Sequence, residues 1–355
     1  MVRRITTNGM MRSYRTNLMR SYNTLARVSE KMTTQRQFNS YAESPAIASQ
    51  AFQLRRNRWN AESQIANNKQ VTHKFQQAWN CLQTTHQDLG HKLGTYSALR
   101  ADNGATAGGR FALGEVLKGT AESIMQTMNA KFGENYIFSG ADGENVPFSW
   151  GPNGEVLFRG KAVDDIANDA DFQKMLNDEH TFVDLGMGMQ EDNAGQLIDA
   201  SAFDTALQGI QYIGYGMTNE ITLSDGVTKV QNVPNNLASI LKEMGEIYSN
   251  CDADSGNFAS VDDQHRAEAL EIQLRDKLND LHSGFVELDT RGTYLKTNED
   301  RLTDLDDSLN TQITTLEDVD PADAITALMW GQYSYNAALR IGTSILSQSL
   351  IDYMR

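Results

Sequence analysis

Leucine recurs at every seventh position through much of the C-terminal half of the chain. The series is Leu274, Leu281, Leu288, Leu295, Leu302, Leu309 and Leu316, and the offsets between these positions hold Leu270, Leu278, Phe285, Leu305 and Ile313. A seven-residue apolar repeat on a helix of 3.6 residues per turn forms a seam that a partner helix must cover. The sequence therefore predicts a long helix over about 262–317. Gly284 and Gly292 each weaken it by about 1 kcal/mol relative to Ala, and we interpret them as positions of close approach.

The partner helix is visible upstream. Its seven-residue series is Ile47, Leu54, Ala61, Phe75, Leu82, Leu89 and Tyr96, with Ala51, Ile65, Trp79 and Leu93 at the intermediate offset. This helix is predicted from about Pro45, a residue suited to a first turn, to Leu99, a length of ~80 Å at ~1.5 Å per residue. Asn68 alone interrupts the seam, and a lone polar residue there is typical of one that sets register. A Gly-rich break at 103–109 leads to a third predicted helix over about 110–132, with Leu113, Leu117, Ile124 and Met128 on one stripe.

Both ends of the chain predict amphipathic helices of about thirty residues. The first, over 1–33, has Met11, Leu18, Leu25 and Met32 seven apart, with Tyr14, Tyr22 and Val28 between them. The last, over 322–355, steps by three, four and seven through Leu328, Tyr335, Leu339, Gly342, Leu346, Leu350 and Tyr353. Trp330 and Tyr333 make this helix apolar almost all round. Neither helix can hide its apolar face alone, so we expect the two to lie side by side and to pack against neighbouring subunits.

The segment between the helical parts has a different character. Residues 136–234 are rich in Gly, Asp and Asn, with short strand-like runs NYIFSG, VPFSW, EVLFRG and EITLSDGVTKV. Asp225-Gly226 in the last run is a hairpin signal. We expect a solvated, mainly β insert at the far end of the helical rod. A short helix from Asn235 to Ser249, with Leu237, Ile240, Leu241, Met244 and Tyr248 inward, leads back to the rod.

The charge is unevenly distributed. The formal net charge is -15, which argues against a general nucleic-acid binder. Residues 1–58 carry eleven basic and two acidic residues, or +9, whereas residues 262–323 carry seventeen acidic and six basic residues, or -11. Opposite charges predict attraction between these stretches or to complementary neighbours. No apolar stretch approaches the ~20 residues of a membrane span, and the start MVRRITTNGMMRSYR lacks the apolar region of a cleaved signal peptide.

Catalytic and metal-binding motifs are not evident. The six histidines form no i, i+4 pair and no HExxH motif. The run GATAGGR lacks the GK[ST] ending of a phosphate-binding loop. Asp252, Asp254 and Asp263 superficially resemble a calcium loop, but Asn257 replaces the turn glycine and the final residue is Asp rather than the bidentate Glu. An acidic turn with a helix N-cap is expected instead. Cys81 and Cys251 are predicted to be free thiols. We therefore expect no enzyme activity, no cofactor and no metal.

Four segments carry a resemblance to a known family. They are RITTNGMMRSYRTNLMRSYNTLARVSEKMTTQRQFNSYAESPAIASQAFQLR, KFGENYIFSGADGENVPF, ELDTRGTYLKTNEDRLTDLDDSL and SILSQSLIDYMR. The chain resembles the bacterial flagellin-type axial proteins, and within them the hook-associated protein 3 family of the hook–filament junction. The resemblance covers most of 1–148 and 235–355 and does not extend to the insert. The chain departs from the family at one point: where the family usually has an acidic pair before the loop proline, this chain has Glu43-Ser44.

The resemblance implies a structural subunit, exported without cleavage through the flagellar type III apparatus and assembled as an adaptor between hook and filament. It implies as partners copies of the chain in a helical ring or tube, neighbouring hook-associated proteins, flagellin and an export chaperone. It further implies an inner tube domain (1–44 and 318–355), a helical rod domain (45–135 and 235–317) and an outer domain (136–234). The expected subunit-interface residues are Tyr14, Leu18, Leu25, Met32, Tyr335, Leu339, Leu346 and Leu350.

Three alternatives remain open at this point. The first is flagellin, the bulk filament subunit, whose amphipathic terminal helices must also bury their apolar faces against other subunits. A coiled-coil scaffold or adhesin unrelated to flagella should keep both termini helical in the dilute monomer. An enzyme hidden in the insert would need a pocket that this acidic, Gly-rich stretch does not indicate.

Overall fold

The computed structural model describes the backbone of residues 7–101, 107–192, 197–198, 201–252 and 255–353. Side chains are described for residues 9–90, 92, 109–192, 197–198, 201–252 and 255–344. The chain divides into two compact units. Unit 1 comprises residues 1–63 and 303–355, and unit 2 comprises residues 64–302.

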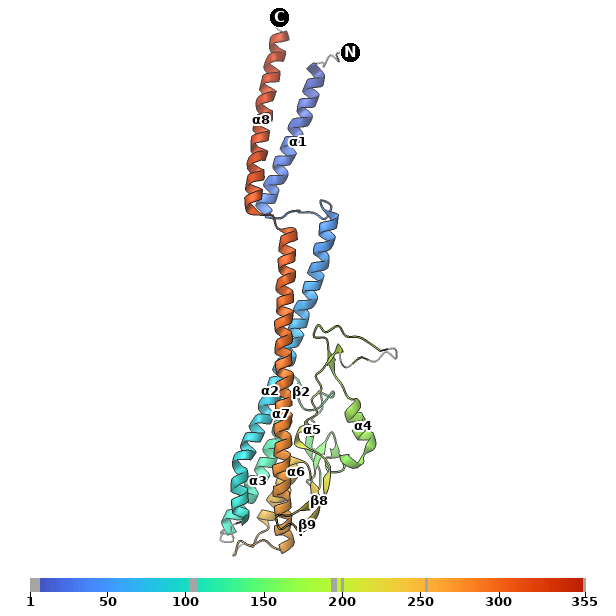
Figure 1. Cartoon of the computed structure of the whole chain (residues 1–355), viewed down its shortest axis with the longest axis vertical. Coiled ribbons are helices and arrows are strands. Elements are labelled where there is room, and N and C mark those ends of the chain that lie inside the picture. Colours follow the sequence, from blue (N-terminus) through green and yellow to red (C-terminus); the bar gives the residue numbers. More distant parts are fainter. Residues whose placement is uncertain (1–6, 102–106, 193–196, 199–200, 253–254, 354–355) are drawn as a thin grey trace. The chain divides into compact units, whose positions relative to one another are not determined.

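Unit 1 is helical. Its elements are α1 (Thr7–Thr34), the first part of α2 (Pro45–Ala101), the last part of α7 (Val261–Glu317) and α8 (Pro321–Tyr353). Helices α1 and α8 lie side by side (Figure 1). The predicted terminal helices and their pairing are thus confirmed, as are the two long helices to within two residues at each boundary.

In unit 2, α2 and α7 run antiparallel and share a buried seam. The seam residues Phe75, Leu82 and Leu89 on α2 are at most 1% exposed, and so are Leu274, Leu281, Leu288, Leu295 and Leu302 on α7. Two further helices pack on one another, α3 (Ala107–Met128) and α6 (Leu237–Ser249). All five predicted inward residues of α6 are fully buried, and Asn236 caps its N-terminus through Oδ1.

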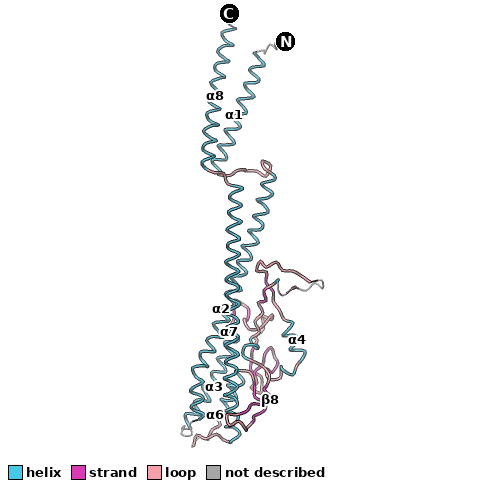
Figure 2. Tube along the Cα trace, viewed as in Figure 1, coloured by secondary structure: helices cyan, strands magenta, loops and turns pink. Residues whose placement is uncertain are grey.

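The rest of unit 2 consists of short strands and helices joined by loops (Figure 2). Antiparallel pairs join β1 (Lys131–Phe132) to β2 (Asn135–Tyr136), and β6 (Phe182–Val183) to β7 (Phe203–Asp204). A three-stranded sheet has the order β3 (Phe148–Trp150), β4 (Val156–Phe158), β5 (Lys161–Ala162). The hairpin of β8 (Met217–Thr222) and β9 (Lys229–Pro234) turns at Asp225-Gly226, as predicted.

The insert differs from the solvated β segment that its composition suggests. It also contains η1 (Ile166–Asn168), α4 (Ala170–Asp178) and α5 (Gly209–Ile213). Phe138, Phe158 and Ile210 are 0% exposed, and they belong to the same apolar core as the helical seam. The insert is therefore packed onto the helices of unit 2.

Three other expectations need correction. Leu305 is 41% exposed and does not fill the seam. Helix α3 ends at Met128 rather than near residue 132, because Asn129 leaves the helix to exchange two hydrogen bonds with the backbone of Phe148. In NYIFSG only Asn135–Tyr136 is a strand.

The polar and glycine positions of the seam have distinct environments. Asn68 is fully buried, its amide donates to the Leu295 carbonyl at 2.8 Å, and its Oδ1 accepts from Asn298 at 3.1 Å. A Cβ at Gly284 would lie 2.7 Å from the Tyr212 ring, whereas nothing lies within 4 Å of one at Gly292. The predicted close approach is confirmed at Gly284, and the same prediction is wrong at Gly292.

Candidate assembly surface

Two glycines bring α1 and α8 together. Gly331 and Gly342 are buried on α8. A Cβ at Gly331 would lie 3.4 Å from Cδ1 of Leu25, and a Cβ at Gly342 would overlap the Tyr14 ring. Each helix places its two contact residues eleven apart, which is about three turns. The two contacts therefore hold α1 and α8 in one antiparallel register.

The contact leaves α1 incompletely covered. Met11, Tyr14, Leu18, Leu25, Val28 and Met32 are half-buried, and no described side chain of α1 is fully buried. On α8 the ring of Tyr335 lies 6.1 Å from that of Tyr22 between centroids. A two-helix pair has no second layer to close its apolar faces, so much of its apolar surface stays in water.

The large apolar side chains that remain exposed are concentrated on α8. Met329 and Trp330 are 66% exposed and Tyr333 is 69% exposed. The further exposed apolar residues of the pair are Met10, Met19 and Tyr22 on α1, and Ile325, Leu339 and Ile341 on α8. We call Met329, Trp330 and Tyr333 the α8 outer face. Contiguous exposure of this kind is uncommon on monomeric soluble proteins and marks interaction sites.

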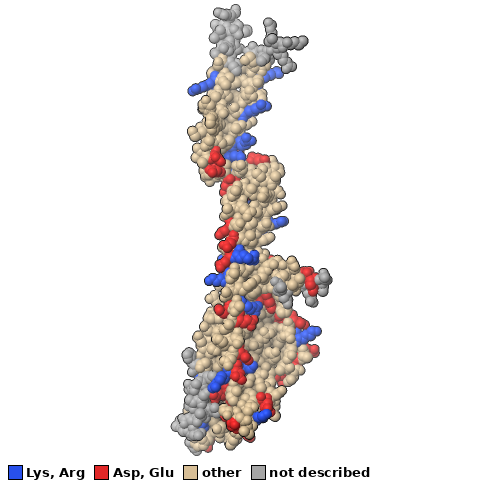
Figure 3. All heavy atoms as spheres, in the orientation of Figure 1, with Lys and Arg blue, Asp and Glu red and all other residues tan. Residues whose placement is uncertain are grey.

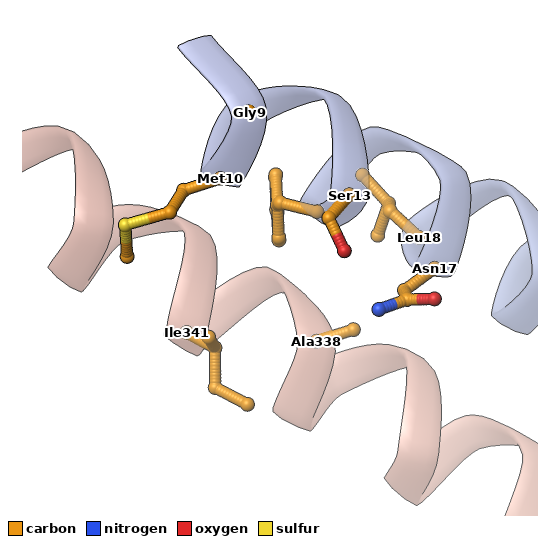
Figure 4. Close-up of a pocket in the computed structure, with 8 residues that line it drawn as sticks. Gly9, Met10, Ser13, Asn17, Leu18, Ala338 and Ile341 are labelled. Carbon is orange, nitrogen blue, oxygen red and sulfur yellow. The ribbon is translucent and has the colours of Figure 1, made fainter. Parts of the chain in front are cut away.

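A shallow groove lies between the two helices. Its volume is about 330 Å³, and Met10, Ser13, Tyr14, Asn17 and Leu18 of α1 line it together with Ala338 and Ile341 of α8. Figure 4 shows these side chains on the two facing helices. The groove contains no charged side chain, so it is suited to an apolar partner surface.

The predicted interface residues have different positions in this surface. Tyr14, Leu18, Leu25, Met32 and Tyr335 are half-buried, with Tyr14 and Leu25 against the α8 glycines of the same chain. Leu339 is 40% exposed. The side chains of Leu346 and Leu350 lie outside the described residues. Trp330 and Tyr333 lie off the periodic stripe of α8 and are not among the predicted interface residues, although the sequence shows both as apolar.

A buried carboxylate anchors the connections next to this pair. Glu317, at the end of α7, is 8% exposed and accepts a hydrogen bond from Arg55, and Arg36 lies 3.7 Å away. The backbone N–H of Gln37 donates to the Glu317 carbonyl at 2.6 Å, and that of Val319 donates to the Gln35 carbonyl at 3.0 Å. Hydrogen bonds thus tie the α1–α2 connection to the α7–α8 connection.

A polar cleft of unit 2 offers a second place to look for chemistry. Two of its carboxylates are engaged in the fold: both oxygens of Glu179 accept from Arg159 at 2.9 Å, and Asp204 accepts from the backbone N–H of Thr181 and of Ala206. Burial raises the pKa of the Tyr212 phenol above its usual range. These contacts hold loops together, and they place no nucleophile beside a base.

The remaining sequence candidates are structural where they are described. Ser260 caps α7, since its hydroxyl accepts from the Asp263 N–H at 3.0 Å, which confirms the N-cap; Asp254 lies outside the described residues. Cys81 and Cys251 are free, and burial raises the pKa of both thiols. Within the described residues there is no group of three or more potential metal ligands. In the same residues, no helix is long and apolar enough to cross a membrane.

Comparisons with known proteins give matches among solved structures only. No protein-family model and no curated protein matches the sequence. A structure described as a flagellar hook-associated protein from Vibrio parahaemolyticus is 14% identical, with a TM-score of 0.55 over 78% of this chain and 100% of that chain. A flagellar hook-associated protein-3 from Legionella pneumophila is 14% identical, with a TM-score of 0.49 over 74% of this chain and 98% of that one.

A flagellar junction protein from the same bacterium is 13% identical, with a TM-score of 0.43 over 70% of this chain and 99% of its own. Identities this low carry information about architecture alone. The match to the Vibrio structure extends over the whole of that chain. The likeness shows that this chain has the fold of a flagellar hook-associated protein.

Proposed function

We propose that this chain is a structural subunit of the bacterial flagellum that acts as the adaptor at the hook–filament junction. Two observations support the proposal: the fold shared with a flagellar hook-associated protein, and the sequence segments that resemble the same family. The subunit serves by packing rather than by catalysis.

The observation that carries the proposal is the exposed apolar surface of the α1–α8 pair. Trp330 and Tyr333 are each about two-thirds exposed, and burial of a large apolar side chain contributes about 1.5–3 kcal/mol. Contact with the same surface of further copies and of neighbouring axial proteins removes these apolar side chains from water. A heterologous contact of this type repeats from copy to copy and builds a ring or an open helical tube.

The proposal assigns a role to each part of the chain. Residues 1–44 and 318–355 form the inner tube, with Tyr14, Leu18, Leu25, Met32, Tyr335, Leu339, Leu346 and Leu350 at or beside subunit contacts. Residues 45–135 and 235–317 form the surrounding rod, and residues 136–234 the outer domain. The partners are copies of the chain, hook-associated proteins, flagellin and an export chaperone, and export proceeds without a cleaved signal peptide.

The test is assembly of the purified chain on isolated hooks that lack it, followed by electron microscopy. The junction role predicts binding at hook tips without elongation, whereas long filaments grown from this chain alone would identify it as flagellin. Trp330→Asp combined with Tyr333→Asp should abolish tip binding and leave the helical content of the monomer unchanged, because both side chains are exposed before assembly.

A matched control is Val227→Asp, which places the same charge at an 80% exposed apolar position in the β8–β9 turn. It should assemble like the unsubstituted protein. Normal tip binding by the Trp330/Tyr333 variant would contradict the assignment of the α8 outer face.

A further inference from the structure

A second aromatic surface lies on α2 in unit 1 and uses residues separate from those of the α1–α8 pair. Phe52 is 62% exposed and Trp59 is 69% exposed. They are seven residues apart and therefore share one side of the helix. The seam of α2 is occupied by other residues, with Ala51 and Ala61 at 2% and 1% exposure. Packing within the chain therefore does not account for these two rings.

An arginine lies between the two rings on the same side. Arg56 is four residues from Phe52 and three from Trp59, and it is exposed. Its neighbours are engaged: Arg55 binds Glu317, and Arg58 contacts Asp306 at 3.0 Å. Arg56 has no ion pair among the described residues. We call Phe52, Arg56 and Trp59 the α2 stripe.

Helix α7 of unit 1 carries the opposite charge. Asp304 and Asp307 are exposed, three residues apart, and have no ion pair among the residues that the structure describes. The seam side of α7 holds Leu302 and Leu309, which are 0% and 7% exposed. At 100° per residue, the two carboxylates point away from that seam. Figure 3 shows acidic atoms gathered along this part of α7.

The two surfaces cannot meet within one chain, since each faces away from the α2–α7 seam. We propose that the α2 stripe of one copy docks on the Asp304–Asp307 surface of a neighbouring copy. The guanidinium of Arg56 would lie between the two carboxylates, and the two rings would cover the contact from water. Trp and Arg are favoured at the centre of interfaces, and complementary charge fixes partner and register.

The proposal rests on the proposed function, because it needs an assembly of copies, but it uses residues separate from the α1–α8 pair. The contact joins two different surfaces and is therefore heterologous, so it adds copies in one direction around a ring or helix. It would set the lateral spacing of subunits, while the terminal helices close the inner tube.

Charge exchange tests the pairing. Arg56→Glu should lower the copy-to-copy association measured by cross-linking on isolated hooks, and so should Asp304→Arg combined with Asp307→Arg. The chain with all three substitutions should recover association, since the charges are exchanged across the contact. Trp59→Ala should weaken association by at least about tenfold, whereas Phe111→Ala, at a 54% exposed aromatic of α3, should not.

Recovery in the triple variant with unchanged monomer helicity would support the contact. Loss in Arg56→Glu without recovery would overturn the choice of α7 as the docking surface and indicate another partner protein. Normal association of Arg56→Glu and Trp59→Ala would overturn the proposal altogether. If charge exchange restores association but the Trp330/Tyr333 variant still assembles, this contact stands and the terminal-helix assignment fails.

Discussion

Helices α3 and α6 touch through two glycines, and this contact allows a sharp prediction of stability. A Cβ atom at Gly114 would lie 2.8 Å from the Gly245 carbonyl oxygen and 2.9 Å from the Ser249 backbone nitrogen. Both are backbone atoms, which cannot rotate aside as a side chain can. An alanine at position 114 must therefore push the two helices apart.

The expected magnitude follows from two opposing effects. Replacing Gly by Ala inside a helix contributes about 1 kcal/mol of stability, and overpacking of a close contact costs about 1–3 kcal/mol. Because the clash is with backbone, we expect Gly114→Ala to lower the free energy of unfolding by about 1–2 kcal/mol. A change of 1 kcal/mol moves Tm by about 2–4 °C in a unit of this size, so the fall in Tm should be about 2–8 °C.

Gly119 is the matched control on the same helix, because nothing lies within 4 Å of a Cβ placed there. Gly119→Ala should raise the free energy of unfolding by up to about 1 kcal/mol. Urea unfolding followed by circular dichroism measures both variants. Equal stabilisation by the two substitutions would refute the inference that α3 and α6 are in backbone contact.

Three further predictions concern unit 2. Asn298→Leu should lower the free energy of unfolding by about 2–4 kcal/mol, since it leaves Asn68 Oδ1 and a backbone carbonyl buried without a donor; urea unfolding with a loss below 1 kcal/mol would contradict it. Burial, together with the nearby charges of Asp165 and Glu243, raises the pKa of Asp164 to about 6. Because the pKa of this carboxyl is higher in the folded chain than in the unfolded chain, the carboxyl stabilises the fold at low pH, and that contribution is lost as the pH rises through about 6. The free energy of unfolding of Asp164→Asn, relative to that of the wild type, should therefore rise by about 1–2 kcal/mol between pH 4 and pH 7. A gain that does not vary with pH would show that the carboxylate is solvated. Gly284→Ala should be about 1–2 kcal/mol less stable than Gly292→Ala, and thermal melts that rank them in reverse would contradict the ring contact at position 284.

The helical part of the fold was predictable because its signal is periodic and local. The repeated leucines of α7 and the upstream series define both long helices and their pairing, and Pro45 and Glu317 lie at the observed ends. The prediction that Leu305 fills the seam was wrong, because a heptad pattern does not determine how wide a strip of the helix its partner covers. With one partner helix, the seam of α7 covers Leu302 and Leu309 and leaves Leu305 partly in water.

The insert was harder to predict because its core is built from distant segments. Phe138, Phe158 and Ile210 are buried together with the helical seam, but none lies in a repeating pattern. The acidic, Gly-rich composition reflects the loops rather than the core. Helix α4, whose N-cap Asp169 accepts from the Phe172 N–H at 3.0 Å, is short enough to be hidden between turn residues.

Pairings between residues that are distant in the sequence could not be predicted either. Asn68 was recognised as a polar interruption of the seam, but nothing local identifies Asn298 as its partner. His86 and His282 lie 5.4 Å apart between ring centroids across α2 and α7, although no sequence motif links them. Burial, and then the nearby His282, lowers the pKa of His86.

The candidate surface was predicted in outline and refined by the structure. The terminal stripes gave the α1–α8 pair, and the half-buried residues Tyr14, Leu18 and Leu25 belong to it. The more exposed residues of the α8 outer face were not selected, because a stripe argument favours periodic positions. Of the two glycines that set the register, Gly342 lies on the predicted stripe and Gly331 does not, and a hydrophobic pattern identifies neither as a close contact because neither carries a side chain.

The most direct measurement is covalent labelling of Trp330 and Tyr333 in the free chain and in the chain bound to isolated hooks. If assembly buries the α8 outer face, both side chains should label readily in the monomer and become strongly protected on binding, while Val227 changes little. Equal labelling of Trp330 in the two states, with binding confirmed by electron microscopy, would show that this surface faces water in the assembled structure and would contradict the proposed mode of assembly.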